Sequence, residues 1–170
     1  VPGGRSRNAA LWVAIGSVFF IGYSLRDEVI DVGRKLKAEL LPDQGIVGDQ
    51  SITYRARVSG HFVIEAKVDG VAIRFLVDTG ATSVVLSPQD AARLGFDIKR
   101  LSFDQIFQTA NGTVRAAPVK LGRVSVGPIE LKNVRASVNG AAMNTSLLGM
   151  SFLSRLGGYE VVGDKLILKR

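Results

Sequence analysis

Residues 75–86 read FLVDTGATSVVL. This stretch places one carboxylate, Asp78, between two strongly apolar segments that are typical of buried β-strands. An aspartate in such surroundings is costly to bury unless it is hydrogen-bonded or paired. Gly80 permits a tight turn, so that its amide and that of Ala81 can point toward the carboxylate. The stretch therefore predicts a functional carboxylate held in a turn between two strands.

The residues around this stretch carry many short strand signals separated by turns. Residues 62–68 alternate between apolar and polar, and Asp69-Gly70 after them favours a two-residue hairpin. Asn111-Gly112 gives a second hairpin signal. Further strands are predicted over residues 72–77, 84–86, 103–109, 113–119, 124–126, 129–138, 159–162 and 165–168.

Two short helices complete the predicted domain. Ser87 can cap a helix that has Pro88 in its first position and ends at Gly95. A second short helix is predicted over residues 150–156. This pattern predicts an all-β domain, a small closed β-barrel with one or two short helices.

Three motifs stand in a recognisable order along the chain. The Asp-Thr-Gly-Ala run at 78–81 comes first, then the hairpin around 107–118, then Leu147-Leu148-Gly149 before the second helix. Together they resemble the retropepsin-like aspartic proteases, and most of all the bacterial, membrane-anchored ones. The resemblance covers about residues 55–169 and implies a retropepsin-like β-barrel.

The resemblance also implies roles for individual residues. Asp78, Thr79 and Gly80 would form the catalytic turn, with Thr79 bonded across a two-fold axis. Ala81 would contact substrate, together with four residues of the hairpin, which would act as a flap: Thr109, Ala110, Asn111 and Gly112. Because Ala81 cannot donate the hydrogen bond that a serine could, we expect activity in mildly acidic to near-neutral conditions.

The chemistry of such proteases sets the expected assembly. Two carboxylates must share a proton, one activating water while the other polarises the scissile carbonyl. This chain has one Asp-Thr-Gly run, at 78–80, so we expect a homodimer that acts on polypeptide. The strand at 165–168 is expected to form the dimer sheet. Two alternatives stay open: a catalytically silent module that binds peptide or mediates assembly, and a structural β-domain tethered to the membrane.

The N-terminal part of the chain predicts a membrane anchor. Residues 9–25 contain no charge, which is the short end of a bilayer-spanning length. A signal peptide and a buried helix are the alternatives. We expect an anchor over residues 1–25, a linker or stalk over 26–50 and a protease domain over 51–170. The family likeness implies a single-pass protein of the bacterial inner membrane with a periplasmic protease domain.

Composition excludes several other classes of protein. The chain has no cysteine and one histidine, His61, so a thiolate zinc site or a Ser-His triad is not expected. No metal and no cofactor are predicted. Residues 51–170 hold 16 Lys and Arg against 9 Asp and Glu. These cations are scattered without interleaved aromatic residues, so we expect no nucleic-acid partner.

Overall fold

The computed structural model describes residues 45–109 and 112–170 of the chain. The predicted membrane segment over residues 9–25 lies outside them, as does the predicted linker up to residue 44. No helix in the described part is long and apolar enough to cross a membrane. The anchor and the division of the chain at residues 25 and 50 therefore stay predictions.

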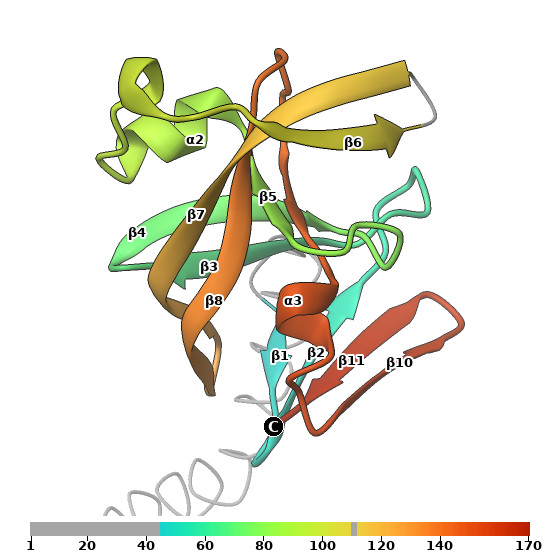
Figure 1. Ribbon diagram of the computed structural model, residues 1–170. Helices are drawn as coiled ribbons and strands as arrows, with labels where there is room; N and C mark the ends of the chain where they lie inside the picture. The colour runs from blue at the N-terminus through green and yellow to red at the C-terminus, as the bar shows by residue number, and fades with distance from the viewer. Residues whose placement is uncertain (1–44, 110–111) are drawn as a thin grey trace, which may run out of the picture. The chain divides into compact units, whose positions relative to one another are not determined.

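The described residues form a mostly β structure with two short α-helices (Figure 1). The prediction of an all-β domain with one or two short helices is thus confirmed. In chain order the elements are β1 Ile46–Val47, β2 Ser51–Arg55, β3 Val63–Val68, β4 Val71–Val77, β5 Val84–Leu86, α2 Pro88–Arg93, the 3-10 helix η2 Ile98–Arg100, β6 Gln105–Thr109, β7 Gly112–Val126, β8 Ile129–Asn139, β9 Ser146–Leu148, α3 Met150–Leu153, β10 Gly158–Val162 and β11 Lys165–Lys169.

Local chemistry explains several of these boundaries. Asp69 and Gly70 link β3 to β4 with φ values of 47° and 91°. A two-residue hairpin with a type I′ turn needs this left-handed backbone at both positions. The Ser87 hydroxyl accepts a hydrogen bond from the Asp90 amide at 3.1 Å and so caps α2. Gly95, with a φ of 87°, follows the end of that helix.

The larger sheet has seven strands in the order β3-β4-β9-β5-β8-β7-β6. β9 lies between β4 and β5, parallel to the first and antiparallel to the second. Both strands that flank the Asp-Thr-Gly turn therefore pair with one strand from much later in the chain. The sheet also bends far enough for β3 to pair with β7, at Lys67↔Ser125 and Val68↔Val124. This seam is two residue pairs long, and full closure of the barrel stays a prediction.

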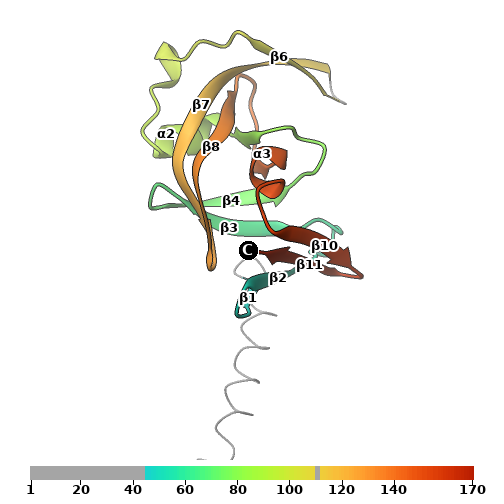
Figure 2. The same ribbon diagram turned by 60° about the horizontal axis from the view of Figure 1, so that its bottom comes forward.

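The smaller sheet has the order β1-β2-β11-β10 (Figure 2). Its strand β1 lies in the last residues of the predicted linker, where Ile46 pairs with Thr53 of β2. Strand β11 pairs with β2 on one side and with β10 on the other. Both edges of β11 are thus paired within one copy, so a second copy could join this sheet only through β1 or β10, and the dimer sheet over residues 165–168 stays a prediction. The two edges of this sheet are β1 and β10.

Strand β7 is longer than the sequence predicts. Separate strands are expected over 113–119 and 124–126, whereas β7 runs through both. The Asp69 carboxylate stabilises the middle of β7 by accepting hydrogen bonds from the amides of Gly122 (3.1 Å) and Arg123 (2.7 Å). A Cβ at Gly122 would lie 2.6 Å from Oδ1 of Asp69. Gly122 therefore makes room for the Asp69 carboxylate beside the strand.

Helix α3 is shorter than predicted and ends at Leu153 instead of residue 156. The Ser154 hydroxyl donates a hydrogen bond to the Met150 carbonyl at 2.6 Å. It thus competes with backbone amides for a carbonyl acceptor in the last turn of the helix.

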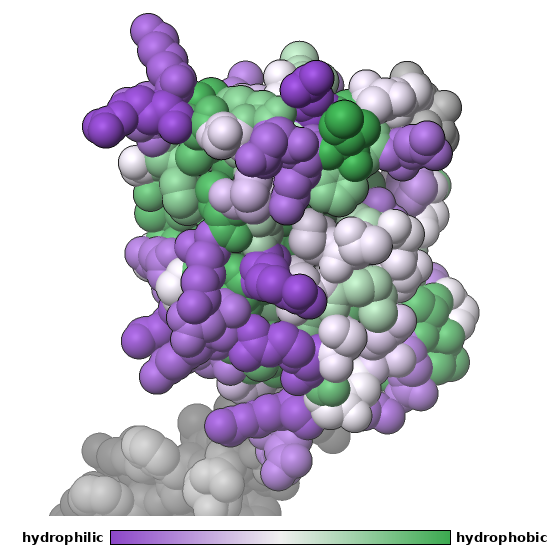
Figure 3. Space-filling view, viewed as in Figure 1, coloured by the Kyte–Doolittle hydropathy of each residue, from purple (hydrophilic) through white to green (hydrophobic). Residues whose placement is uncertain are grey.

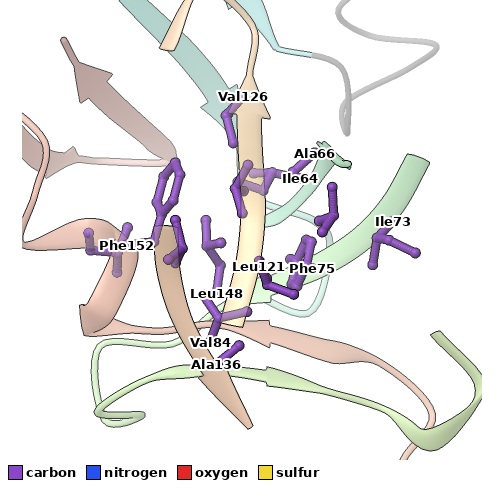
Figure 4. Close-up of a cluster of buried hydrophobic side chains, with 14 of the residues drawn as sticks. Ile64, Ala66, Ile73, Phe75, Val84, Leu121, Val126, Ala136, Leu148 and Phe152 are labelled. Carbon is purple, nitrogen blue, oxygen red and sulfur yellow. The ribbon is translucent and has the colours of Figure 1, made fainter. Parts of the chain in front are cut away.

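The core joins the larger sheet to α3. Figure 4 shows side chains from β3, β4, β5, β7, β8, β9 and α3 packed into one cluster. Its largest members include Phe75, Leu121, Leu148 and Phe152, each fully buried. Phe75 and Leu148 come from the two strands that support the Asp-Thr-Gly turn, so the core fixes the position of that turn.

Candidate active site

Asp78 begins the turn that follows β4. Its amide donates to the Leu148 carbonyl on β9 at 3.2 Å, and its Oδ1 accepts from the Gly80 amide at 2.8 Å. The Ala81 amide donates to the main-chain carbonyl of Asp78 at 3.3 Å and not to its carboxylate. Asp78 is half-buried, whereas Thr79 and Gly80 are exposed. The turn thus holds one carboxylate oxygen by a backbone amide.

Gly149 explains how this turn can lie so close to the segment after β9. The Met150 amide donates to the Ala81 carbonyl at 2.8 Å. A Cβ at Gly149 would lie 2.5 Å from that carbonyl oxygen and would also clash with the carbonyl oxygen of Ser83. Both obstacles are backbone atoms, which cannot move aside as a side chain can. The glycine after Leu147-Leu148 therefore permits the contact between the two motifs.

Ser151 ties the strand that leaves the turn to the rest of the domain. This side chain is buried on α3. Its hydroxyl accepts from the Val84 amide at 2.9 Å and donates to the Arg135 carbonyl at 2.6 Å. One side chain therefore holds α3, β5 and β8 together beside the turn.

The turn opens into a cleft with a volume of about 880 Å³. Of the predicted site residues, Asp78, Gly80 and Ala81 line it. Neither Thr79 nor Gly112 is among the described residues that line the cleft. Gly112 begins β7 and pairs with Thr109 of β6. The other two predicted flap residues, Ala110 and Asn111, lie outside the described residues.

The hairpin of β6 and β7 does face the cleft, through residues that the sequence does not single out. Phe107 and Gln108 contribute from β6, and Thr113 and Val114 from β7. Each pair lies next to the predicted flap residues. The hairpin thus borders the cleft, and the predicted contact of its tip with substrate stays a prediction.

The cleft also has walls that were missed. Val85 and Leu147 line it from the centres of β5 and β9, where their neighbours along each strand are buried in the core. Strand alternation could have identified these two residues. Ser137 and Asn139 line it from β8, and Ala141, Ala142 and Met143 from the loop after β8. No sequence signal marks that loop, because only long-range packing brings it to the cleft.

No metal-binding site is identified among residues 45–109 and 112–170. They contain no group of three or more His, Cys, Asp or Glu side chains that could hold a metal ion. His61 is exposed, in the segment between β2 and β3.

An Asp-Thr-Gly turn packed against a Leu-Leu-Gly strand, in a mostly β domain, defines a retropepsin-like aspartic protease fold. The family model described as gag-polyprotein putative aspartyl protease matches residues 64–155, which include both motifs. The chain belongs to this family.

Bacterial proteins resemble the chain beyond the matched segment. An uncharacterized protein from the cobV 5' region of Sinorhizobium sp is 37% identical over 169 residues, covering 96% of this chain and 72% of that protein. An uncharacterized protein of Rickettsia prowazekii is 38% identical over 160 residues, covering 94% and 69%. The crystal structure of a retropepsin-like aspartic protease from Rickettsia conorii superimposes with a TM-score of 0.65 at 42% identity, covering 72% of this chain and 100% of that one.

Proposed function

We propose that the chain is an aspartic endopeptidase in which Asp78 activates a water molecule to hydrolyse peptide bonds. The observation that carries this proposal is the half-buried Asp78 carboxylate, with one oxygen fixed by the Gly80 amide, in the wall of a cleft of about 880 Å³. A carboxylate fixed in this way needs little reorganisation to deprotonate a bound water. The family and the Rickettsia conorii structure support protease activity.

The second carboxylate of the proposed mechanism comes from another copy of the chain. Asp78 is the only acidic residue among those that line the cleft in the described part of the chain. Two copies of Asp78 related by a two-fold axis would share one proton, so that one acts as base and the other donates to the scissile carbonyl. Thr79 is exposed beside Asp78, where a partner could reach it.

Strand β10 is the proposed contact between the two copies. It is a free edge of the smaller sheet, and it follows α3 closely in the chain. Three of its apolar side chains are exposed: Tyr159 by 38%, Val161 by 58% and Val162 by 58%. An exposed apolar edge strand tends to pair with another strand. Pairing of β10 with its own copy would extend the sheet across the two-fold axis.

Hydrolysis is tested with the full chain, wild type and Asp78→Asn, incubated with denatured proteins from about pH 4 to about pH 7.5. Mass spectrometry of the fragments identifies the cleaved bonds. We expect cleavage by the wild type alone. If neither protein cleaves while both are folded dimers, the chain is a silent peptide-binding or assembly module.

The shared dyad is tested by co-expressing wild type and Asp78→Asn chains in equal amounts. If each active site needs two intact copies, about one quarter of the dimers are active. If each chain works alone, about one half of the activity remains. The first value supports a dyad formed across the dimer, and the second contradicts it.

Residues 9–25 are proposed to anchor the chain in the bacterial inner membrane, with the protease domain in the periplasm. Support comes from the uncharged apolar run and from the family likeness. Reporter fusions after residue 30 and after residue 170 would determine the orientation. Recovery of the full chain in the soluble fraction would contradict the anchor.

A further inference from the structure

A second groove continues the cleft away from Asp78. Its volume is about 510 Å³, and it shares three lining residues with the cleft: Thr82, Ser83 and Phe107. Since the two hollows have a common wall, an extended polypeptide that lies over Asp78 would run on into the second groove.

The second groove contains one charged side chain. Arg135 of β8 lines it, and every other lining residue in the described part of the chain is uncharged. The Arg135 carbonyl is held by the Ser151 hydroxyl at 2.6 Å, so the strand that carries this guanidinium is fixed. The groove therefore has one cationic residue on its wall, carried by a fixed strand.

A second cation stands directly beside the first. Lys120 of β7 pairs with Arg135 across the two strands, and both side chains are exposed. Opposed residues of antiparallel strands face the same side, with Cβ atoms about 4.5–5.5 Å apart. Like charges in this position repel each other and destabilise the sheet.

No acidic group within the described residues compensates this pair. The ion pair formed between β7 and β8 joins Arg123 to Glu130 at 3.4 Å and includes neither Lys120 nor Arg135. Figure 3 shows hydrophilic side chains gathered over β7 and β8. A carboxylate from outside the domain would relieve the repulsion and gain a bidentate contact with the guanidinium.

We infer that Lys120 and Arg135 bind an acidic side chain of the substrate, at a position removed from the scissile bond. This specificity rests on the proposed protease function, because the groove extends the same cleft. The excess of cations in residues 51–170 would assist by attracting acidic polypeptides before they dock.

The test uses the full chain and a panel of neutral peptides in which a single Glu is moved along the sequence, each compared with its Gln counterpart. We expect one position at which Glu raises kcat/KM about three- to tenfold over Gln at low salt. The advantage should shrink as salt is added, because both cations are exposed. A ratio near one at every position would overturn the inference while leaving proteolysis established.

Charge reversal identifies the residue. In Arg135→Glu the preference for Glu over Gln at that position should be lost, because the new carboxylate lies opposite Lys120 and pairs with it. Lys132→Glu is the matched control, since Lys132 is exposed on the same strand and is not among the residues that line the second groove. It alters the net charge equally and should keep the preference for Glu. Loss of the preference in both variants would indicate long-range attraction and contradict a specific site.

A binding measurement keeps the inference testable without catalysis. The same Glu and Gln peptides, labelled with a fluorophore, are titrated against Asp78→Asn and against Asp78→Asn combined with Arg135→Glu. Tighter binding of the Glu peptide to the first protein alone supports the acidic subsite even if the wild type hydrolyses nothing. Equal binding of the two peptides to both proteins would overturn it.

Discussion

The Ser146 hydroxyl donates a hydrogen bond of 2.6 Å to Oδ2 of Asp90. Ser146 begins β9, the strand that supports the Asp78 turn, and Asp90 lies in α2. The same hydroxyl accepts from the Ser87 amide at 3.0 Å. Helix α2 and strand β9 are thus joined behind the candidate site by a buried serine and a largely buried carboxylate. The structure of the candidate site therefore depends on Ser146 and Asp90, two residues that do not line the cleft.

Asp90→Ala should lower the free energy of unfolding by about 2 kcal/mol, because it leaves the fully buried Ser146 hydroxyl without its acceptor. Denaturant unfolding measures the loss. In the double variant Asp90→Ala with Ser146→Ala, the loss of unfolding free energy should be smaller than the sum of the two single losses by more than about 0.5 kcal/mol. Gln89→Ala, on the exposed face of the same helix, is the control. Additive losses would show that the two residues act independently.

Gly149→Ala should prevent the turn from forming. The new Cβ would lie 2.5 Å from the Ala81 carbonyl oxygen and would press on that of Ser83. We expect a loss of several kcal/mol, or failure to fold, as seen by circular dichroism and thermal melting. Gly158→Ala should be tolerated, because the nearest neighbour of the new Cβ would be Cδ of Lys169 at 3.8 Å, an ordinary van der Waals contact. A stable Gly149→Ala protein would show that the two motifs can separate.

The sequence predicts those parts of the fold that depend on local chemistry. The hairpin at Asp69-Gly70 and the cap at Ser87 are set by the conformational preferences of the residues themselves. The order of strands around β9 is different, because it depends on packing between segments far apart in the chain. The pairing of β11 on both sides could not be inferred either, since an alternating strand looks the same at an edge and in the middle of a sheet.

The candidate site likewise contains residues that local sequence patterns predict and residues that only long-range packing brings to the cleft. Asp78 and Gly80 are visible in the sequence because a charged residue and a glycine stand out between apolar strands. Met143 and Ser137 reach the cleft through tertiary packing that no local pattern reports.

Pro118 lies within β7, where a proline is unusual. The pairing of β6 with β7 does not extend past Ala116, whereas β8 pairs with β7 at Pro118. One edge of β7 is therefore open at this position and tolerates proline.

Ser137→Ala should leave the free energy of unfolding unchanged or raise it. The Ser137 hydroxyl is buried and has no hydrogen-bond partner among the described residues. Its removal therefore abolishes the desolvation free energy that an unpaired buried hydroxyl costs. Ser151→Ala is the contrasting variant. It should lower the free energy of unfolding by about 2–3 kcal/mol, because two hydrogen bonds between the Ser151 hydroxyl and the backbone are lost. Thermal melting of both proteins checks the difference. Equal destabilisation would mean that Ser137 has a partner.

Tyr54→Phe should make the domain more resistant to alkali. Burial of Tyr54, with a smaller contribution from Glu65, raises the pKa of its phenol above the ordinary value of about 10. The folded protein keeps this proton when the unfolded chain loses it, so wild-type stability falls as the pH rises beyond about 10. The variant lacks this loss. Unfolding curves at about pH 8 and about pH 11 measure it, and parallel declines in both proteins would contradict the assignment.

Val161→Lys should weaken the dimer and lower the activity per chain at low protein concentration. Val161 is 58% exposed on the edge strand β10, and a two-fold contact there would bring the two new cations together. We expect at least about a tenfold rise in the dimer dissociation constant by analytical ultracentrifugation, with activity restored at high concentration. Val47→Lys is the matched control, because Val47 is 54% exposed on β1, the opposite edge of the same sheet. If Val47→Lys separates the chains and Val161→Lys does not, the two copies meet at β1, and the geometry of the proposed Asp78 pair has to be rebuilt around that edge.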